Sequence, residues 1–289
     1  MEESRLHNSD GESESGTGGQ SWRVALLVEY QGTGYAGFQL QVGHPTIQGE
    51  LEKALAKFTG QEIRIRGASR TDSGAHAKGQ MVDFLTSTQH PLERFAPALN
   101  FHLPEDIKIL EAYQVDEGFD SRRWALSRVY QYSILNRHSP SPLRRHSHFW
   151  IRDGLDTEKM IQAAQLLVGT HDFRALAVGH PENRSAVRSV LRWEVERVGD
   201  SVVIECEANG FMKQQIRKTN GLLTEIGRGK YPVERVSQAL GGDASGAPLL
   251  PAHGLCLISV KYPSSTKFRE ARDDDWNNRN GIINKHETN

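Results

Sequence analysis

Residues 67–76 read Gly-Ala-Ser-Arg-Thr-Asp-Ser-Gly-Ala-His, and no other stretch of the chain places so many reactive side chains among so many small ones. The small residues leave room for a bulky ligand beside Asp72, and glycines 67 and 74 permit backbone angles that other residues avoid. Most loop aspartates, however, simply hydrogen-bond their own turn. By itself the loop therefore supports a functional aspartate and a structural turn about equally.

Outward from this loop, hydrophobic patterns predict two segments of similar design, residues 22–118 and 119–263. In the first we expect strands at 22–30, 62–66, 80–85 and 107–115, a helix capped by Thr46 and a short helix at 93–100. In the second we expect strands at 128–136, 187–198, 201–208 and 255–261 and helices at 156–168, 211–227 and 233–240. Sheets with helices covering one face predict an α+β protein whose two halves meet at a cleft.

The two ends of the chain and its composition narrow the class of protein. Residues 1–21 are rich in Gly, Ser and Glu and are expected to be a disordered acidic tail, and residues 264–289 a polar extension. No apolar run approaches the ~20 residues that a membrane helix needs, and no secretory signal follows Met1. Cys206 and Cys256 lack metal-ligand spacing, which favours reduced thiols in a cytosolic protein.

The net charge is −1, but the charged residues are distributed unevenly along the chain. Residues 121–152 contain no acid but hold arginines at 122, 123, 128, 137, 144, 145 and 152. Residues 211–230 add further bases around the single acid Glu225. Arginine-rich surfaces suit phosphate, so the pattern favours a nucleic-acid partner, although a charge run is often only a solvated face.

Gly32-Thr33-Gly34-Tyr35-Ala36-Gly37 has the glycine spacing of a dinucleotide site and follows a predicted strand. The rest of that fingerprint is missing. No helix opens within the glycines, and no acidic residue ends a second strand about 20 positions later. We therefore expect a tight turn here and no nucleotide cofactor.

Arg70-Thr71-Asp72-Ser73-Gly74-Ala75-His76, followed by Gly79-Gln80, resembles the RTDxGVH-type catalytic loop of the tRNA pseudouridine synthase A family. Segments 29–39, 127–132, 211–229 and 253–257 resemble the same family in order and spacing, so the similarity covers about residues 22–263. Ser73 and Ala75 replace the usual Ala and Val. Residues 213–215 and Thr219-Asn220 also depart from the family's basic helix.

The resemblance implies a fold of two ferredoxin-like (RRM-like) halves, with largely antiparallel sheets and a basic catalytic cleft between them. It also implies an isomerase that converts uridine to pseudouridine at positions 38–40 of the tRNA anticodon arm. Such an enzyme would be a cytoplasmic homodimer. It would need no cofactor and no metal, because the reaction oxidises nothing and consumes no water.

The family's roles fall on five residues of this chain. The resemblance assigns Asp72 as the nucleophile, Arg217 as its ion-pair partner and Arg70 as the residue that props the space of a flipped-out base. Tyr130 and Leu255 would contact the target uracil. Plainer interpretations remain open: Arg217 could be solvated or bind a phosphate, and Tyr130 and Leu255 could be ordinary buried strand residues.

Other functions were weighed against this one. A pseudouridine synthase acting on other RNA sites would share the same motifs. A non-catalytic RNA-binding protein of the same fold is disfavoured by the intact Arg70, Asp72, Tyr130 and Arg217. A phosphohydrolase with an aspartyl nucleophile would need Mg²⁺ and further carboxylates near Asp72, which the sequence lacks. His76, His171 and Asp172 do not have the spacing of a common metal site.

Overall fold

The structure is a computed structural model that describes residues 21–270. The predicted tail therefore lies outside the described residues apart from Ser21, as do residues 271–289 of the predicted extension. The strands are β1 (Trp22–Tyr30), β2 (Arg66–Gly67), β3 (His76–Thr86), β4 (Ile107–Val115), β5 (Ser127–Asn136), β6 (Phe149–Ile151), β7 (Gly169–Asp172), β8 (Val187–Val198), β9 (Ser201–Ala208), β10 (Leu255–Lys261) and β11 (Arg269–Glu270). The helices are α1 (Ile47–Thr59), α2 (Phe95–His102), α3 (Thr157–Gln165), α4 (Gln215–Gly227) and α5 (Arg235–Leu240).

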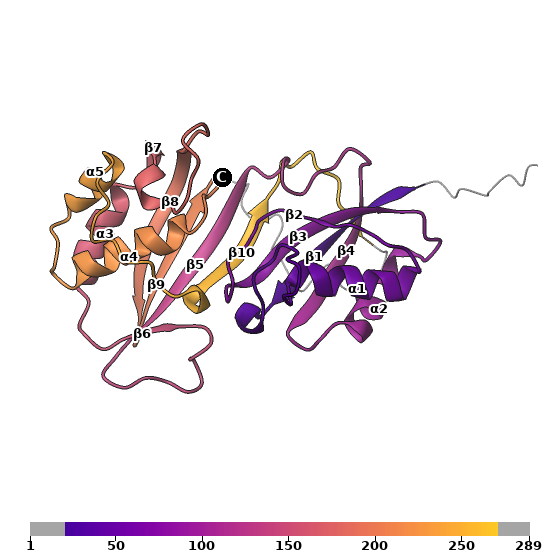
Figure 1. The fold of residues 1–289 in the computed structure, drawn as a ribbon, viewed down its shortest axis with the longest axis horizontal. Coiled ribbons are helices and arrows are strands. Elements are labelled where there is room, and N and C mark those ends of the chain that lie inside the picture. The colour runs from indigo at the N-terminus through magenta and orange to yellow at the C-terminus, as the bar shows by residue number, and fades with distance from the viewer. Residues whose placement is uncertain (1–20, 271–289) are drawn as a thin grey trace, which may run out of the picture.

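Within residues 21–270 all the strands belong to one sheet, in the order β11-β4-β1-β3-β10-β5-β9-β8-β7, with β2 on β3 and β6 on β5. The two predicted segments join where β10 runs parallel to β3 and antiparallel to β5. Helices α1 and α2 lie over one end of the sheet and α3, α4 and α5 over the other, with β3 and β10 between the two groups (Figure 1). The predicted α+β class and largely antiparallel sheet are confirmed.

A continuous hydrophobic core fills the space between the helices and one face of the sheet. It takes alternate residues of the strands, such as Val24, Leu26 and Val28 of β1, because successive strand side chains point to opposite faces. A smaller cluster covers the other face at the β1 and β4 end, where Ala25 and Tyr113 meet residues 115–124 and 262–268. Because the helices cover one face of the sheet, the middle of the opposite face is left to loops and polar side chains.

The strand predicted at 62–66 is wrong for all but its last residue, since β2 covers only Arg66–Gly67. The reason lies in helix α1. The Ile65 N–H donates to Glu52 Oε1 at 3.1 Å, and the Ile65 carbonyl accepts from Gln48 Nε2 at 3.4 Å. Side chains of α1 thus take the backbone groups that a strand would offer to a neighbouring strand.

Helix α4 begins at Gln215, four residues later than the predicted start at Phe211. Gln214 has a φ of 58°, a left-handed conformation that interrupts a helix. The Gln215 side chain then accepts from the Met212 N–H at 2.9 Å, reaching back three residues as a capping-box glutamine does. Strands β6, β7 and β11 were not predicted, and each has four residues or fewer, too few for a visible alternation.

Asp83 on β3 is fully buried and holds the connection between the two halves. Its Oδ2 accepts from the guanidinium groups of Arg23 and Arg66, and its Oδ1 accepts from the Ser121 N–H at 2.9 Å. Arg66 also pairs with Asp120 at 3.0 Å. This network fixes residues 119–122, where the chain passes from β4 to β5, against the strands beneath the 67–76 loop.

We expect Asp83→Ala to lower the free energy of unfolding by about 3–5 kcal/mol, because it leaves two arginines beside an empty buried site. The control is Asp200→Ala. Asp200 also pairs with two arginines, Arg137 and Arg144, but its side chain is 33% exposed, so we expect a much smaller loss. Denaturant titration of both variants measures the difference. Equal losses would show that burial does not set the strength of the Asp83 network.

Candidate active site

The loop at residues 67–76 leaves β2, passes over the sheet and enters β3, and Gln80 of β3 lies beneath it. Gln80 is fully buried and bonds Ser69 twice: its Oε1 accepts from the Ser69 N–H at 3.2 Å, and its Nε2 donates to the Ser69 carbonyl at 2.6 Å. The Tyr30 hydroxyl lies 2.7 Å from Thr71 Oγ1. The backbone of Ser69 and the side chain of Thr71, on either side of Arg70, are therefore tied to β3 and β1.

The glycine-rich turn at residues 32–37 packs directly against this loop. A Cβ atom on Gly32 would lie 1.9 Å from the Ala75 carbonyl oxygen, and one on Gly37 would lie 2.9 Å from that of Thr71. Gly37 also has a φ of 99°, whereas a Cβ on Gly34 would meet nothing within 4 Å. The prediction that these glycines shape a tight turn is confirmed, and two of the three permit close approach to the loop of Asp72.

His76 joins the turn, the loop and the strand β10. Its Nδ1 accepts from the Gly32 N–H at 3.1 Å, and its Nε2 lies 3.0 Å from the His253 carbonyl oxygen. A carbonyl can only accept, so Nε2 carries the proton and the ring is neutral. Burial lowers the pKa of His76, which favours the same state. His76 thus anchors the end of the loop.

Asp72 and Arg217 lie 145 positions apart in the sequence and meet at the centre of the molecule. Arg217 Nη1 donates to Asp72 Oδ2 at 2.8 Å, and Arg217 Nε donates to the Leu250 carbonyl at 2.7 Å. The side chains are 21% exposed for Asp72 and 12% for Arg217. Within residues 21–270 the other carboxylate oxygen, Oδ1, makes no hydrogen bond, so it is free to act on a ligand.

Tyr130 of β5 and Leu255 of β10 lie on the face of the sheet that carries the Asp72 loop. Both are buried, with 4% and 5% exposed, and Leu255 pairs with Tyr132 across the two strands. The Tyr130 ring meets Phe211 edge-on at 5.5 Å. Its hydroxyl points at the loop and lies 2.7 Å from Ser69 Oγ. Burial raises the pKa of the Tyr130 hydroxyl, the charge of Asp72 lies close enough to raise it further, and Leu255 shares the same face of the sheet.

Arg70 is exposed beside Asp72, and its side chain makes no hydrogen bond or ion pair within the described part of the chain. Partial burial lowers its pKa, and the positive charge of the nearby Arg122 lowers it further. Two guanidinium groups close together without a carboxylate between them favour an anion such as phosphate.

Five of the seven arginines of the predicted phosphate surface divide into two groups. Arg128 is 8% exposed and donates to four backbone carbonyls, and Arg137 and Arg144 both pair with Asp200. Arg122 and Arg123 are exposed, and their side chains have no partner among residues 21–270. Fewer than seven arginines are therefore free to bind phosphate. Arg122, which lies near Arg70, and Arg123 are the clearest candidates.

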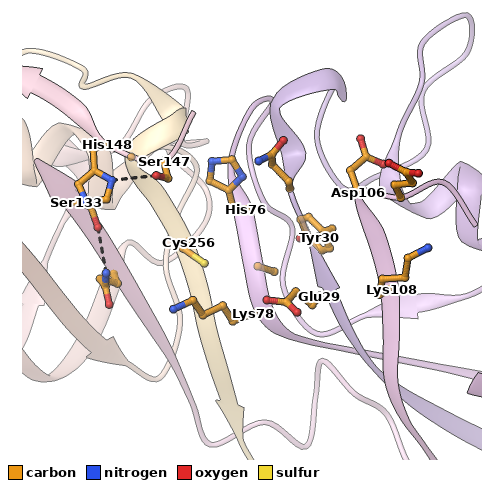
Figure 2. Close-up of a pocket in the computed structure, with 15 residues that line it drawn as sticks. Glu29, Tyr30, His76, Lys78, Asp106, Lys108, Ser133, Ser147, His148 and Cys256 are labelled. Carbon is orange, nitrogen blue, oxygen red and sulfur yellow. Dashed lines mark hydrogen bonds between the residues drawn. The ribbon is translucent and has the colours of Figure 1, made fainter. Parts of the chain in front are cut away.

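A pocket of about 460 Å³ lies at the junction of the two halves, but on the other face of the sheet from Tyr130 (Figure 2). Its lining includes Gln131 and Cys256, which pair across β5 and β10 and alternate with Tyr130 and Leu255. Figure 2 shows Glu29, Lys78 and Lys108 around it. Neither Asp72 nor Arg217 lines this pocket, so it is separate from the candidate active site.

Among residues 21–270 no group of three or more histidine, cysteine, aspartate or glutamate side chains is arranged to hold a metal ion. The same residues contain no helix long and apolar enough to cross a membrane. His171 instead lies near the carbonyl of Val168, at 3.0 Å from its Nε2. His171 is part of β7 and pairs with Arg188 of β8.

Sequence reasoning placed Asp72, Arg217 and Tyr130 near one another but missed the residues that hold them. The contacts under the loop are made by Gln80, Ser69 and Tyr30. Residues of these three types are common in strands and loops, so their presence alone does not indicate these contacts. Gln80 belongs to the motif that follows the loop, but nothing in the sequence shows that its side chain bonds the backbone of Ser69. The role of the Gln80 side chain depends on which backbone segment passes over strand β3.

Comparison with known proteins agrees with the motifs. "tRNA pseudouridine synthase A" of Caulobacter vibrioides is 40% identical over 83% of this chain and 98% of its own length, and that of Myxococcus xanthus is 37% identical over 83% and 92%. The solved "Crystal Structure of a Cbf5-Nop10-Gar1 Complex" aligns with 70% of this chain and 45% of that chain at 13% identity, with a TM-score of 0.33. The model of the family described as "tRNA pseudouridine synthase" matches residues 26–122 and 163–263. The chain belongs to the tRNA pseudouridine synthase family.

Proposed function

We propose that this protein isomerises uridine to pseudouridine in tRNA, at positions 38–40 of the anticodon arm, with Asp72 as the nucleophile. The observation that carries the proposal is the contact of Asp72 with Arg217, which brings a loop of the first half against a helix of the second. Three other motif segments contact the loop of Asp72, because Tyr30 bonds Thr71, Tyr130 bonds Ser69 and the His253 carbonyl accepts from His76. The identity to proteins named for this reaction supports the assignment.

The chemistry requires an ionised carboxylate, because the N1–C1′ bond must break and C5 must be joined to C1′. A base stacked over a carboxylate removes water from it and disfavours its charge. The Arg217 guanidinium at 2.8 Å offsets that cost. Because Arg217 holds Oδ2, the unbonded Oδ1 is the atom aimed at the substrate.

The other site residues serve to present the uridine. A base inside a stem cannot be reached in place, so it must leave the helix, and Arg70 at the exposed rim of the loop fills the space it vacates. Tyr130 and Leu255 contact the uracil from the sheet, and Tyr130 receives the proton that C5 loses. The substrate enters between the two ferredoxin-like halves, above β3 and β10, in a basic cleft.

The localisation, the oligomeric state and the lack of a cofactor are also proposed from the resemblance. The enzyme works in the cytoplasm as a homodimer, without a metal or a nucleotide cofactor. Measurement of the mass in solution by light scattering decides the oligomeric state: a mass near twice 32.3 kDa agrees with the proposal, and a monomer at assay concentration contradicts it.

The test of the function is incubation of the purified full chain with an unmodified tRNA transcript, followed by chemical mapping of pseudouridine. We expect modification confined to the uridines at positions 38–40. Pseudouridine at other tRNA positions or only in other RNAs would favour the alternative synthase. Tight tRNA binding without any pseudouridine would favour the non-catalytic RNA-binding protein.

Binding should depend steeply on salt because phosphate contacts release counterions. We expect the double variant Arg122→Gln/Arg123→Gln to flatten the slope of log K against log salt by about one unit for each lost phosphate contact. The matched control is Arg137→Gln/Arg144→Gln, whose guanidinium groups pair with Asp200. Filter binding over a salt series measures both. If the control alone flattens the slope, the phosphate surface lies elsewhere.

A further inference from the structure

The hydroxyl group of Ser69 contacts the hydroxyl group of Tyr130 with an oxygen–oxygen distance of 2.7 Å. This is the only side-chain hydrogen bond of the Tyr130 hydroxyl within residues 21–270. The Tyr130 side chain is 4% exposed and its ring lies edge-on against Phe211. Any proton that leaves the Tyr130 oxygen while a substrate covers the site therefore has one protein atom to go to.

Ser69 is placed for this contact by its backbone. Gln80 accepts from its N–H and donates to its carbonyl, so the residue is held on both sides while its side chain is free to bond Tyr130. Gln80 itself is fully buried. Ser69 is only half-buried, in contrast to Tyr130, so its hydroxyl has access to water.

Tyr130 is protonated at neutral pH. Burial raises the pKa of its hydroxyl well above the usual value, the hydrogen bond shared with Ser69 opposes this shift, and the negative charge of Asp72 reinforces it. A protonated phenol can accept a proton from carbon only if it gives up its own at the same time. The proposed role of Tyr130 in removing the C5 proton thus needs an acceptor behind the tyrosine.

We propose that Ser69 is that acceptor, a relay through which Tyr130 passes its own proton to water as it takes the proton from C5 of the uracil. The inference rests on the proposed function, since it presupposes that Tyr130 meets C5. Ser69 does not touch the substrate. It acts through Tyr130, as a positioning and relay residue.

The step balances. Once C5 has bonded to C1′, the C5–H bond breaks and its electron pair forms the C5–C6 double bond, while the pair of the N1–C6 double bond moves to N1. The C5 proton binds the Tyr130 oxygen, the former Tyr130 proton binds Ser69 Oγ, and the former Ser69 proton passes to water. N1 takes one proton from water, so no net charge accumulates and both hydroxyl groups are restored.

The experiment follows the release of hydrogen from C5 in single turnovers, with tRNA carrying tritium or deuterium at C5 of uridine. We expect Ser69→Ala to slow release by about a hundredfold, the scale of one general acid–base contribution, and to show a larger C5 deuterium isotope effect than wild type. Ser69→Thr keeps the hydroxyl and should stay near the wild-type rate. Ser133→Ala is the control, because Ser133 lies on the same strand as Tyr130 and its hydroxyl bonds Gln131 instead.

The double variant separates a relay from a structural role. Ser69→Ala should add nothing to the loss caused by Tyr130→Phe, because both remove the same proton path. A wild-type rate in Ser69→Ala, or the same further loss in the Tyr130→Phe background, would overturn the relay and leave the proposed function standing. A wild-type rate in Tyr130→Phe would instead remove Tyr130 from the chemistry, and the relay with it.

Discussion

We expect Asp72→Asn to abolish pseudouridine formation while tRNA affinity stays within about twofold of wild type. The amide keeps the shape of the carboxylate but loses its charge and its nucleophilicity. We expect turnover to fall by about 10⁴-fold or more, the scale seen when one member of a catalytic unit is removed. Binding is spared because it comes from phosphate contacts spread over a wide surface. Tritium release from C5 and filter binding of the same variant measure the two quantities.

The control for this prediction is Asp106→Asn. Asp106 is also hydrogen-bonded to a loop beside the site, accepting from the Tyr35 hydroxyl at 2.6 Å, but it lies outside the proposed chemistry. We expect it to lower turnover far less than Asp72→Asn. If Asp72→Asn retains a tenth of wild-type turnover, Asp72 is not the nucleophile. If it instead loses affinity and melts early, Asp72 is a structural turn residue.

Gly32→Ala should be the second most damaging change, although residue 32 touches no substrate. The added methyl group would lie 1.9 Å from the Ala75 carbonyl oxygen, so the loop of Asp72 must move. Overpacking of this kind costs about 1–3 kcal/mol of stability, and a 1 Å misplacement of reacting groups can slow catalysis by about a hundredfold. Thermal melting and tritium release of the purified variant measure the two effects.

Gly34→Ala is the matched control, two residues away in the same turn. A methyl group there meets nothing within 4 Å, and we expect wild-type turnover and less than about 0.5 kcal/mol of lost stability. Equal losses of turnover and stability in both variants would mean that the backbone of the turn itself requires glycine at both positions. The contact between Gly32 and the Asp72 loop would then not be what matters.

Much of this arrangement could be predicted from the sequence because its signals are local. The strands at 22–30, 107–115 and 255–261 coincide with their predicted bounds, since each is an apolar or alternating run between polar turns. The helix α1 begins after its predicted cap Thr46 and ends before Gly60, which has a φ of 71°. The loop of Asp72 was recognised because its unusual residues are consecutive.

What could not be predicted depends on contacts between distant segments. The pairing of β10 with β3 as well as β5, which merges both halves into one sheet, leaves no trace in the residues of either strand. The false strand at 62–66 and the late start of α4 at Gln215 follow from individual side chains, Glu52 and Gln215, that bond backbone groups. The fully buried Gln80 looked like an ordinary polar strand residue until the backbone above it was placed.

We propose that this chain modifies tRNA at positions 38–40 through Asp72. This proposal is tested most directly by mapping pseudouridine in tRNA from cells that lack the gene, complemented with the wild-type chain or with Asp72→Asn at equal protein levels. We expect the modification to be absent without the gene, restored at positions 38–40 by the wild type, and still absent with Asp72→Asn. Restoration of pseudouridine by Asp72→Asn, or unchanged tRNA in cells without the gene, would contradict the account.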